Sequence, residues 1–145
     1  MSSTSAVRAP ALLDRIGRAI NEHDVDALTA AFADDVDSSQ PAHPERQFRG
    51  GAQIRQNWTS LFAAVPDLTA TLTRSATDGA TVWAEWDWHG TRLDGKPHRM
   101  RGVTILGERA GRAAWFRLYM EPVVEADGGI DHAIKGLTGT RGGER

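Results

Sequence analysis

Apolar residues in the first half of the chain recur every three or four positions, a spacing typical of amphipathic helices. Such a pattern covers residues 12–20 and predicts a first helix that Pro10 can open. A second helix is predicted over residues 25–33, with Asp24 as its N-cap. A third is predicted over residues 52–64. The N-terminal half is therefore expected to supply three helices.

The second half of the chain alternates between apolar and polar residues, as half-buried strands do. Residues 68–75 predict one strand, and residues 81–121 predict an antiparallel meander of three more. Asp94-Gly95 is a strong signal for a tight hairpin loop inside this meander. Helices followed by such strands predict an α+β fold: a cone-shaped, curved antiparallel sheet packed against three N-terminal helices, with a pocket between them.

Residues 10–122 are predicted to form one domain, because a chain of 145 residues suits a single hydrophobic core. Residues 1–9 are small and polar, and we expect them to be disordered. Residues 123–145 form a Gly-rich tail, in which the apolar residues between Ile130 and Leu137 allow one short amphipathic helix.

Composition and charge narrow the classes of partner. The net charge of −2 favours neither nucleic acid nor an anionic membrane. The chain has no cysteine, which excludes disulfides, thiolate catalysis and thiolate metal sites. No apolar run reaches the length of a membrane span, and the first residues lack a signal-peptide core, so we expect a cytoplasmic protein. The sequence has no glycine pattern for phosphate or dinucleotide binding, and no cofactor is expected.

Strand register decides which side chains of the meander share a face. If Asp94 and Gly95 alone form the loop, Leu93 lies opposite Lys96. The next turn is expected to place Thr104 opposite Phe116. One face then carries Trp83, Glu85, Asp87, His89, Thr104, Phe116, Leu118 and Met120. The other carries Trp86, Trp88, Arg99, Arg101, Trp115 and Arg117, and this mixture of aromatic residues and arginines is typical of an interface.

Four stretches carry a resemblance to a known family. In chain order they are NEHDVDALTAAFADDV, then FRG followed by Ile54 and Trp58, then VWAEWDWHGT, and last RGVTILGERAGRAAWFRLYM. Their order and pattern resemble the nuclear transport factor 2-like superfamily, in particular its SnoaL-like branch of polyketide cyclases and ketosteroid-isomerase-like proteins. The resemblance implies a cone-shaped pocket and a homodimer formed through the sheet. It leaves the function open among isomerases, cyclases, dehydratases, epoxide hydrolases and binding proteins.

The ketosteroid-isomerase mechanism does not carry over to this chain. That family takes up a proton with an aspartate before a proline, and the matching residue before Pro41 is Gln40. Its two oxyanion groups, a tyrosine and a protonated aspartate, match Ile16 and Thr104. An amide takes up no proton at neutral pH, and an alkyl side chain donates no hydrogen bond. The resemblance to SnoaL-like cyclases, which use an acid in the cavity and no cofactor, is unaffected.

Together with the candidate acidic residues, the resemblance implies a protein that binds an apolar small molecule and acts on it as a cofactor-free acid/base enzyme. The expected reaction is a cyclisation or isomerisation of a cyclic, polyketide- or terpenoid-like substrate. Asp87, Glu85 and His89 are the predicted catalytic groups, because two carboxylates and an imidazole would share one pocket. No metal site is expected: Asp87 and His89 could supply two ligands and His43 a third, but nothing enforces their convergence. The predicted substrate-binding residues are Gln40, His43, Trp58, Phe62, Thr104, Phe116, Leu118 and Met120.

Other interpretations fit the same residues. The face with Glu85, Asp87 and His89 can instead be the solvated side of the sheet, with Trp86 and Trp88 buried. The protein can also be a non-catalytic ligand-binding or assembly protein of the same fold, because the isomerase residues are missing. An epoxide hydrolase is a further alternative, although the sequence shows no Asp-Arg-Asp arrangement for it. A pocket filled by side chains would favour the non-catalytic alternative, and an open cavity with converged carboxylates would favour the enzyme.

Overall fold

The computed structural model describes residues 2–139, so Met1 and residues 140–145, the ends of the predicted N-terminal segment and tail, lie outside it. The helices are α1 (Ser2–Asn21), α2 (Val25–Ala30), α3 (Gly51–Ala64) and α4 (Ile130–Thr138), with a 3-10 turn η1 (Pro44–Arg46). The strands are β1 (Phe32–Ser39), β2 (Phe48–Arg49), β3 (Thr69–Asp78), β4 (Thr81–Thr91), β5 (Pro97–Arg109) and β6 (Arg112–Pro122).

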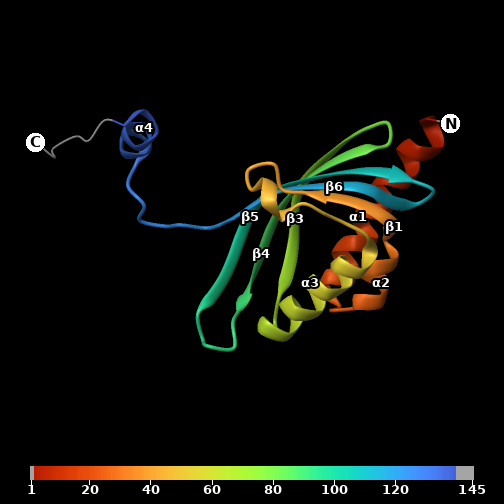
Figure 1. The fold of residues 1–145 in the computed structure, drawn as a ribbon, viewed down its shortest axis with the longest axis horizontal. Coiled ribbons are helices and arrows are strands. Elements are labelled where there is room, and N and C mark those ends of the chain that lie inside the picture. The colour runs from red at the N-terminus through yellow and green to blue at the C-terminus, as the bar shows by residue number, and fades with distance from the viewer. Residues whose placement is uncertain (1, 140–145) are drawn as a thin grey trace, which may run out of the picture.

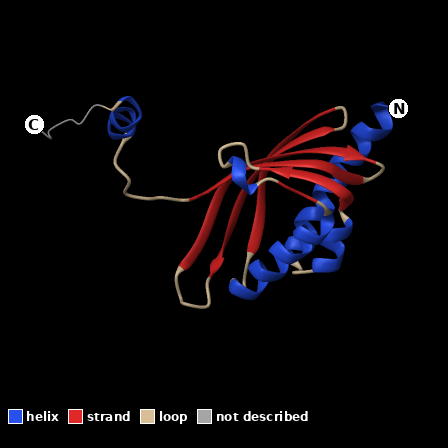
Figure 2. Cartoon of the chain, viewed as in Figure 1, coloured by secondary structure: helices blue, strands red, loops and turns tan. Residues whose placement is uncertain are grey.

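The six strands form one curved, unclosed sheet in the order β2-β1-β6-β5-β4-β3. Neighbouring strands are antiparallel except β1 and β6, which are parallel. Helices α1, α2 and α3 lie together on one side of this sheet (Figures 1 and 2). The predicted α+β fold, with a curved sheet against three N-terminal helices, is therefore confirmed, and the parallel β1–β6 pair makes the sheet mixed.

The first helix extends beyond its predicted start. Residues 2–9, which the sequence suggested to be disordered, belong to α1, and Pro10 lies inside the helix. Ala9 is fully buried, so the turn before Pro10 has a packing partner in the core. Burial of this kind is a tertiary contact, and local composition does not report it.

The second helix is shorter than predicted. It ends at Ala30 instead of Ala33, and β1 begins at Phe32. Phe32 and Val36 are both fully buried, and β1 is hydrogen-bonded to β6, about eighty residues further along the chain. A pairing so distant in sequence overrides the helical spacing of the local apolar residues.

The β4–β5 register differs from the predicted one by one residue. Trp88 lies opposite Met100, and Arg92 pairs with Lys96 around a loop of three residues instead of two. Gly95 has a φ of 83°, and its N–H donates to the carbonyl of Arg92 at 2.9 Å. A three-residue loop that ends in a left-handed glycine produces this geometry. Because side chains alternate with a period of two, the shift moves every side chain of β4 to the opposite face relative to β5.

The shift decides what faces the helices. The β5–β6 pairing keeps the predicted grouping, since Thr104 lies opposite Leu118, although the predicted opposite residue, Phe116, is wrong. The helix-facing side, called the inner face below, carries Val82, Ala84, Trp86, Trp88, Met100, Thr104, Leu106, Phe116, Leu118 and Met120. The opposite side, the outer face, carries Trp83, Glu85, Asp87, His89, Arg99, Arg101, Val103, Ile105, Trp115, Arg117 and Tyr119.

The tail leaves the domain after β6. Val123 extends the pairing by donating to the carbonyl of Arg99, and Arg99 forms an ion pair with Glu125 at 2.7 Å. The predicted tail helix is present as α4, which stands apart from the domain (Figure 1), and none of its residues is buried. Within residues 2–139, no helix has the length and apolar character that crossing a bilayer requires.

Candidate functional site

The space between the helices and the inner face is filled by aromatic side chains. Trp58 of α3 contacts Trp88 of β4 edge-on, with ring centroids 5.5 Å apart, and Phe32 contacts Phe116 in the same manner at 5.2 Å. Trp86 lies 3% exposed beneath α1. The result is a close-packed core at the position where the sequence predicts a ligand pocket.

The hollow that remains inside has a volume of only about 10 Å³. That is room for about one water molecule, whereas ligand pockets measure roughly 300–1,000 Å³. None of its lining residues is ionisable. The lining residues are Leu13, Ile16, Ile20, Leu28, Phe32, Trp58, Trp86, Trp88, Thr104, Leu106 and Phe116.

Polar side-chain groups also border this hollow. The indole N–H of Trp86 donates to the hydroxyl of Thr104 at 2.9 Å. The indole Nε1 of Trp88 is buried and has no hydrogen-bond partner within the described part of the chain. A buried donor without a partner carries a desolvation cost. The lining of the hollow therefore leaves the Trp88 donor unpaired and contains no group that takes up or gives a proton near neutral pH.

The predicted catalytic residues lie on the other side of the sheet. Their expected place beside Thr104 and Phe116 is wrong, because the register shift puts Glu85, Asp87 and His89 on the outer face. Asp87 lies 3.3 Å from Arg101, and Glu85 lies 3.5 Å from Arg74. Both carboxylates line an open hollow of about 520 Å³ on that face. Their catalytic role stays a prediction.

Most of the predicted binding residues gather on the inner side, and two do not. Trp58, Phe62, Thr104, Phe116, Leu118 and Met120 all contribute to or pack against the core. Gln40 instead accepts a hydrogen bond from Arg46 at 2.9 Å at the end of β1. His43 lies 3.0 Å from Glu121 and holds the loop before β2 against the end of β6. The apolar ligand expected in the interior stays a prediction.

The outer face carries an uncovered apolar surface. Trp83 is 39% exposed and Tyr119 is 40% exposed, and Val103 and Ile105 lie beside them. We call these four residues the outer apolar patch. The sequence suggested an interface on this side of β5 and β6, but Trp86 and Trp88, which it included, are buried in the core. Because of the shift in register, Trp83 is the tryptophan of β4 that lies on the outer face, opposite Ile105.

A groove of about 580 Å³ adjoins the patch and is called the Arg117 groove below. It lies between β1, β6 and the loop that leads to β2. Arg117 lies over the ring of Trp115, 5.7 Å from its centroid. No local sequence pattern indicates this groove, because it depends on the parallel β1–β6 pairing. Its lining residues are Asp37, Ser39, Pro41, Gln47, Trp115, Arg117 and Tyr119.

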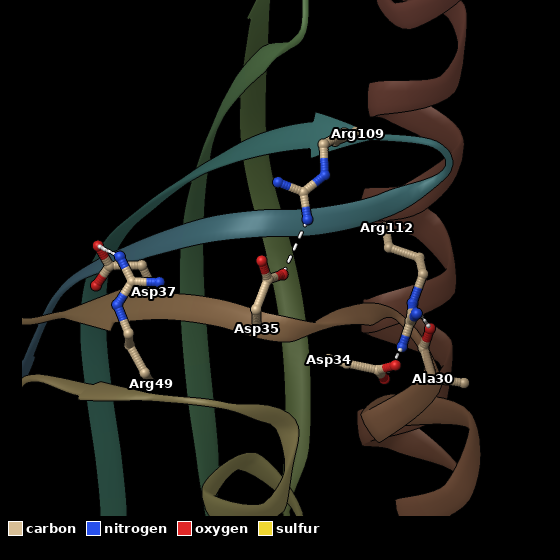
Figure 3. Close-up of polar contacts among 7 residues, drawn as sticks. All are labelled: Ala30, Asp34, Asp35, Asp37, Arg49, Arg109 and Arg112. Carbon is tan, nitrogen blue, oxygen red and sulfur yellow. Dashed lines mark hydrogen bonds and ion pairs between the residues drawn. The ribbon is translucent and has the colours of Figure 1, made fainter.

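Acidic side chains along β1 are each matched by an arginine (Figure 3). The hydrogen bond from Arg109, and then its charge, lower the pKa of Asp35 below the ordinary value of an aspartate. Exposed pairs of this kind contribute little to stability, but they compensate the acidic run in β1. The pairs are Asp34–Arg112 at 3.0 Å, Asp35–Arg109 at 2.9 Å and Asp37–Arg49 at 3.6 Å.

Other ionisable groups do not assemble a site. Burial, and next the charge of Arg92, lower the pKa of His98, which lies opposite Gly90 near the β4–β5 loop. Glu108 is buried and accepts a hydrogen bond from the backbone of Gly111 in the β5–β6 turn. Among the described residues, no three His, Cys, Asp or Glu side chains converge as metal ligands.

Solved structures with a similar fold include proteins of different descriptions. One is an epoxide hydrolase from M. tuberculosis described as LEH-like, with 19% identity and a TM-score of 0.69 over 80% of this chain and 84% of that one. A second, from Catenulispora acidiphila, has a ketosteroid-isomerase-like fold and is in complex with trimethylamine (20% identity, TM-score 0.66, 75% and 84% covered). A third is an NTF2-like protein from Anabaena variabilis (16% identity, TM-score 0.69, 82% and 91% covered). At such identities the likeness shows the fold alone.

No curated protein matches the sequence of the chain. A family model does match it, over residues 13–116, and its description is a SnoaL-like domain. This match covers more than half of the chain. It begins at Leu13 inside α1 and ends at Phe116 inside β6. The chain therefore belongs to the SnoaL-like domain family.

Proposed function

We propose that this protein is a non-catalytic assembly protein of the SnoaL-like family that pairs with a second copy of itself through the outer face of its sheet. The observation that carries the proposal is the outer apolar patch, which no helix within residues 2–139 covers and in which Trp83 and Tyr119 remain 39% and 40% exposed. An uncovered apolar surface on a sheet, flanked by charged residues, is typical of an interaction site.

The filled interior supports the same proposal. Acid/base chemistry on an apolar substrate needs room for that substrate and an ionisable group beside it. The hollow of about 10 Å³ is too small for a substrate, and its lining has no carboxylate or imidazole. A cyclase or isomerase acting in the interior is therefore not favoured. The epoxide-hydrolase alternative is not favoured either, since it needs a carboxylate that positions a water molecule.

A second copy fits the outer face because the acidic groups beside the outer apolar patch are already paired with arginines. Glu85 and Arg74, and Asp87 and Arg101, form ion pairs beside the apolar patch. In a two-fold arrangement the same surface meets itself, so each acidic group can approach a basic group of the other copy. The family resemblance, which implies a homodimer through the sheet, supports this arrangement.

Sedimentation equilibrium of the wild-type protein and two matched variants tests the proposal. Trp83→Glu places a charge in the outer apolar patch, whereas Leu93→Glu places the same charge on a residue that is 77% exposed in the β4–β5 loop. We expect a dimer for the wild type and for Leu93→Glu, and a folded monomer for Trp83→Glu, with circular dichroism to confirm folding. A monomeric wild type, or a dimer that tolerates Trp83→Glu, would overturn the proposal.

A further inference from the structure

We propose that the Arg117 groove binds a small aromatic carboxylate that also carries a hydroxyl group. This site goes beyond the proposed self-association, because it extends from the edge of the outer apolar patch, with which it shares Tyr119, towards β1 and the loop before β2. A groove of about 580 Å³ falls within the range of roughly 300–1,000 Å³ that small-molecule sites occupy.

Arg117 differs from the other arginines on the strands. Each of those contacts a carboxylate at 3.6 Å or less, whereas Arg117 contacts none among the described residues and is exposed over Trp115. A guanidinium group presents parallel N–H donors that match a carboxylate, so an uncompensated one in a groove is suited to an anionic ligand. The paired arginines are Arg49, Arg74, Arg99, Arg101, Arg109 and Arg112.

Trp115 gives the groove an aromatic surface. It lies opposite Gly107, and a Cβ atom at Gly107 would come within 1.9 Å of the indole Nε1. The glycine therefore lets the indole rest directly against the backbone of β5 instead of standing away from the sheet. Tyr119, on the same strand and 40% exposed, adds a second ring. Two aromatic side chains on one side favour a planar ring in the ligand.

Asp37 sets the second polar end of the site. It lies opposite Trp115, whereas Arg117 lies opposite Ser39, so the two charged residues are two strand positions, about 7 Å, apart along the sheet. Asp37 has only long contacts, 3.6 Å to Arg49 and 3.3 Å to Gln47, and its side chain is 38% exposed. Its carboxylate can accept a further hydrogen bond. A benzene ring with a carboxylate and a hydroxyl at opposite ends spans this separation.

The wall of the groove is held in place before a ligand arrives. Pro41 and Gln47 lie in the loop between β1 and β2, which the His43–Glu121 contact at 3.0 Å ties to β6. Arg46 donates to Gln40 at 2.9 Å within the same loop. A wall fixed in this way reduces the ordering that binding requires.

An NMR titration of the full chain with 4-hydroxybenzoate tests the site. We expect saturable shifts of the Trp115 indole and the Gly107 amide. Arg117→Ala should weaken binding about tenfold or more, since hydrogen bonds to charged groups are worth roughly that factor. Arg109→Ala is the matched control: it removes the same charge from an arginine outside the groove and should change the affinity less than about twofold.

Two related probes separate the ends of the ligand. 4-Hydroxybenzyl alcohol lacks the carboxylate and should bind as weakly to the wild type as 4-hydroxybenzoate binds to Arg117→Ala. Benzoate lacks the hydroxyl and should bind the wild type more weakly than 4-hydroxybenzoate does. The two ligands should bind Asp37→Ala equally, because alanine offers the hydroxyl no acceptor. The proposal is overturned if 4-hydroxybenzoate gives no saturable shift, or if Arg117→Ala and Arg109→Ala weaken it alike.

The molar mass of each variant in solution, measured by sedimentation equilibrium, distinguishes a failure of ligand binding from a failure of self-association. Arg117→Ala should lose the ligand at unchanged mass if both proposals hold. A protein that binds the probe as a monomer would leave the groove proposal standing and contradict the dimer. A dimer without saturable binding would do the reverse.

Discussion

The two faces of β4 show how differently one strand can use similar residues. Trp86 and Trp88 point to the helices and are at most 6% exposed, whereas Trp83 on the same strand points outward and is 39% exposed. Glu85 and Asp87, which alternate with these tryptophans along the strand, both lie on the outer face. Apolar bulk is therefore gathered on one side, and charge with scattered aromatic residues on the other.

This difference teaches where function can reside in this member of the family. A face that is closed by tryptophans provides stability, because every large side chain on it is in contact with others. A face that keeps exposed aromatic rings, ion pairs and open hollows provides surfaces for partners and ligands. In this chain the outer face has an open groove, whereas the interior is filled.

The largest expected effect separates the tryptophans of the two faces. Trp86→Ala should lower the free energy of unfolding by about 3–5 kcal/mol, because it leaves a cavity in the core. Trp83→Ala should lower it by only about 1 kcal/mol or less, since its side chain is partly solvated. Urea unfolding at low protein concentration, where association does not contribute, measures both. Equal losses would contradict the assignment of the faces.

A smaller effect is expected at the hydrogen bond inside the core. Thr104→Val leaves the indole N–H of Trp86 buried without an acceptor and should destabilise the protein by about 1–3 kcal/mol. Thr71→Val is the control, because Thr71 is exposed on β3 opposite Asp87 and should change stability by about 0.5 kcal/mol or less. If the two variants are equally stable, the Trp86–Thr104 contact contributes nothing to the core.

The sequence was sufficient for the elements whose signals are local. Helical spacing predicted α1 and α3, alternation predicted β3 to β6, and the apolar residues of the tail predicted α4. Asp94-Gly95 also marked the hairpin between β4 and β5. Such signals act between near neighbours, so they can be read without tertiary contacts.

The candidate site was not predictable in the same way. Asp94-Gly95 fits both a two-residue and a three-residue loop, and only the position of Gly95 in the folded hairpin decides between them. This shift of one residue in register places Asp87 on the outer face and Trp88 in the core. The Arg117 groove depends on the parallel pairing of β1 with β6, which joins distant parts of the chain.

The smallest expected effect concerns an ion pair on the solvated side. Arg109→Ala should raise the pKa of Asp35 towards its ordinary value, because the hydrogen bond and the charge of Arg109 lower it. Since the pKa is lowered in the folded state, the pair stabilises the fold above the unfolded-state pKa, and this contribution is lost as the pH falls through the folded-state pKa. Carboxyl NMR measures the shift.

Arg112→Ala provides the control for that titration. Arg112 contacts Asp34 at 3.0 Å, so its removal should leave the pKa of Asp35 unchanged. If the pKa of Asp35 stays low without Arg109, the pair shown in Figure 3 is not its cause.

The central claim is that the outer face of the sheet is the working surface and the interior is a closed core. Amide and indole NMR spectra recorded over a series of protein concentrations test it most directly. The account predicts concentration-dependent shifts at Trp83, Val103, Ile105 and Tyr119, with the indoles of Trp86 and Trp88 unchanged. Shifts confined to the helical side, or spectra that do not change with concentration, would contradict it.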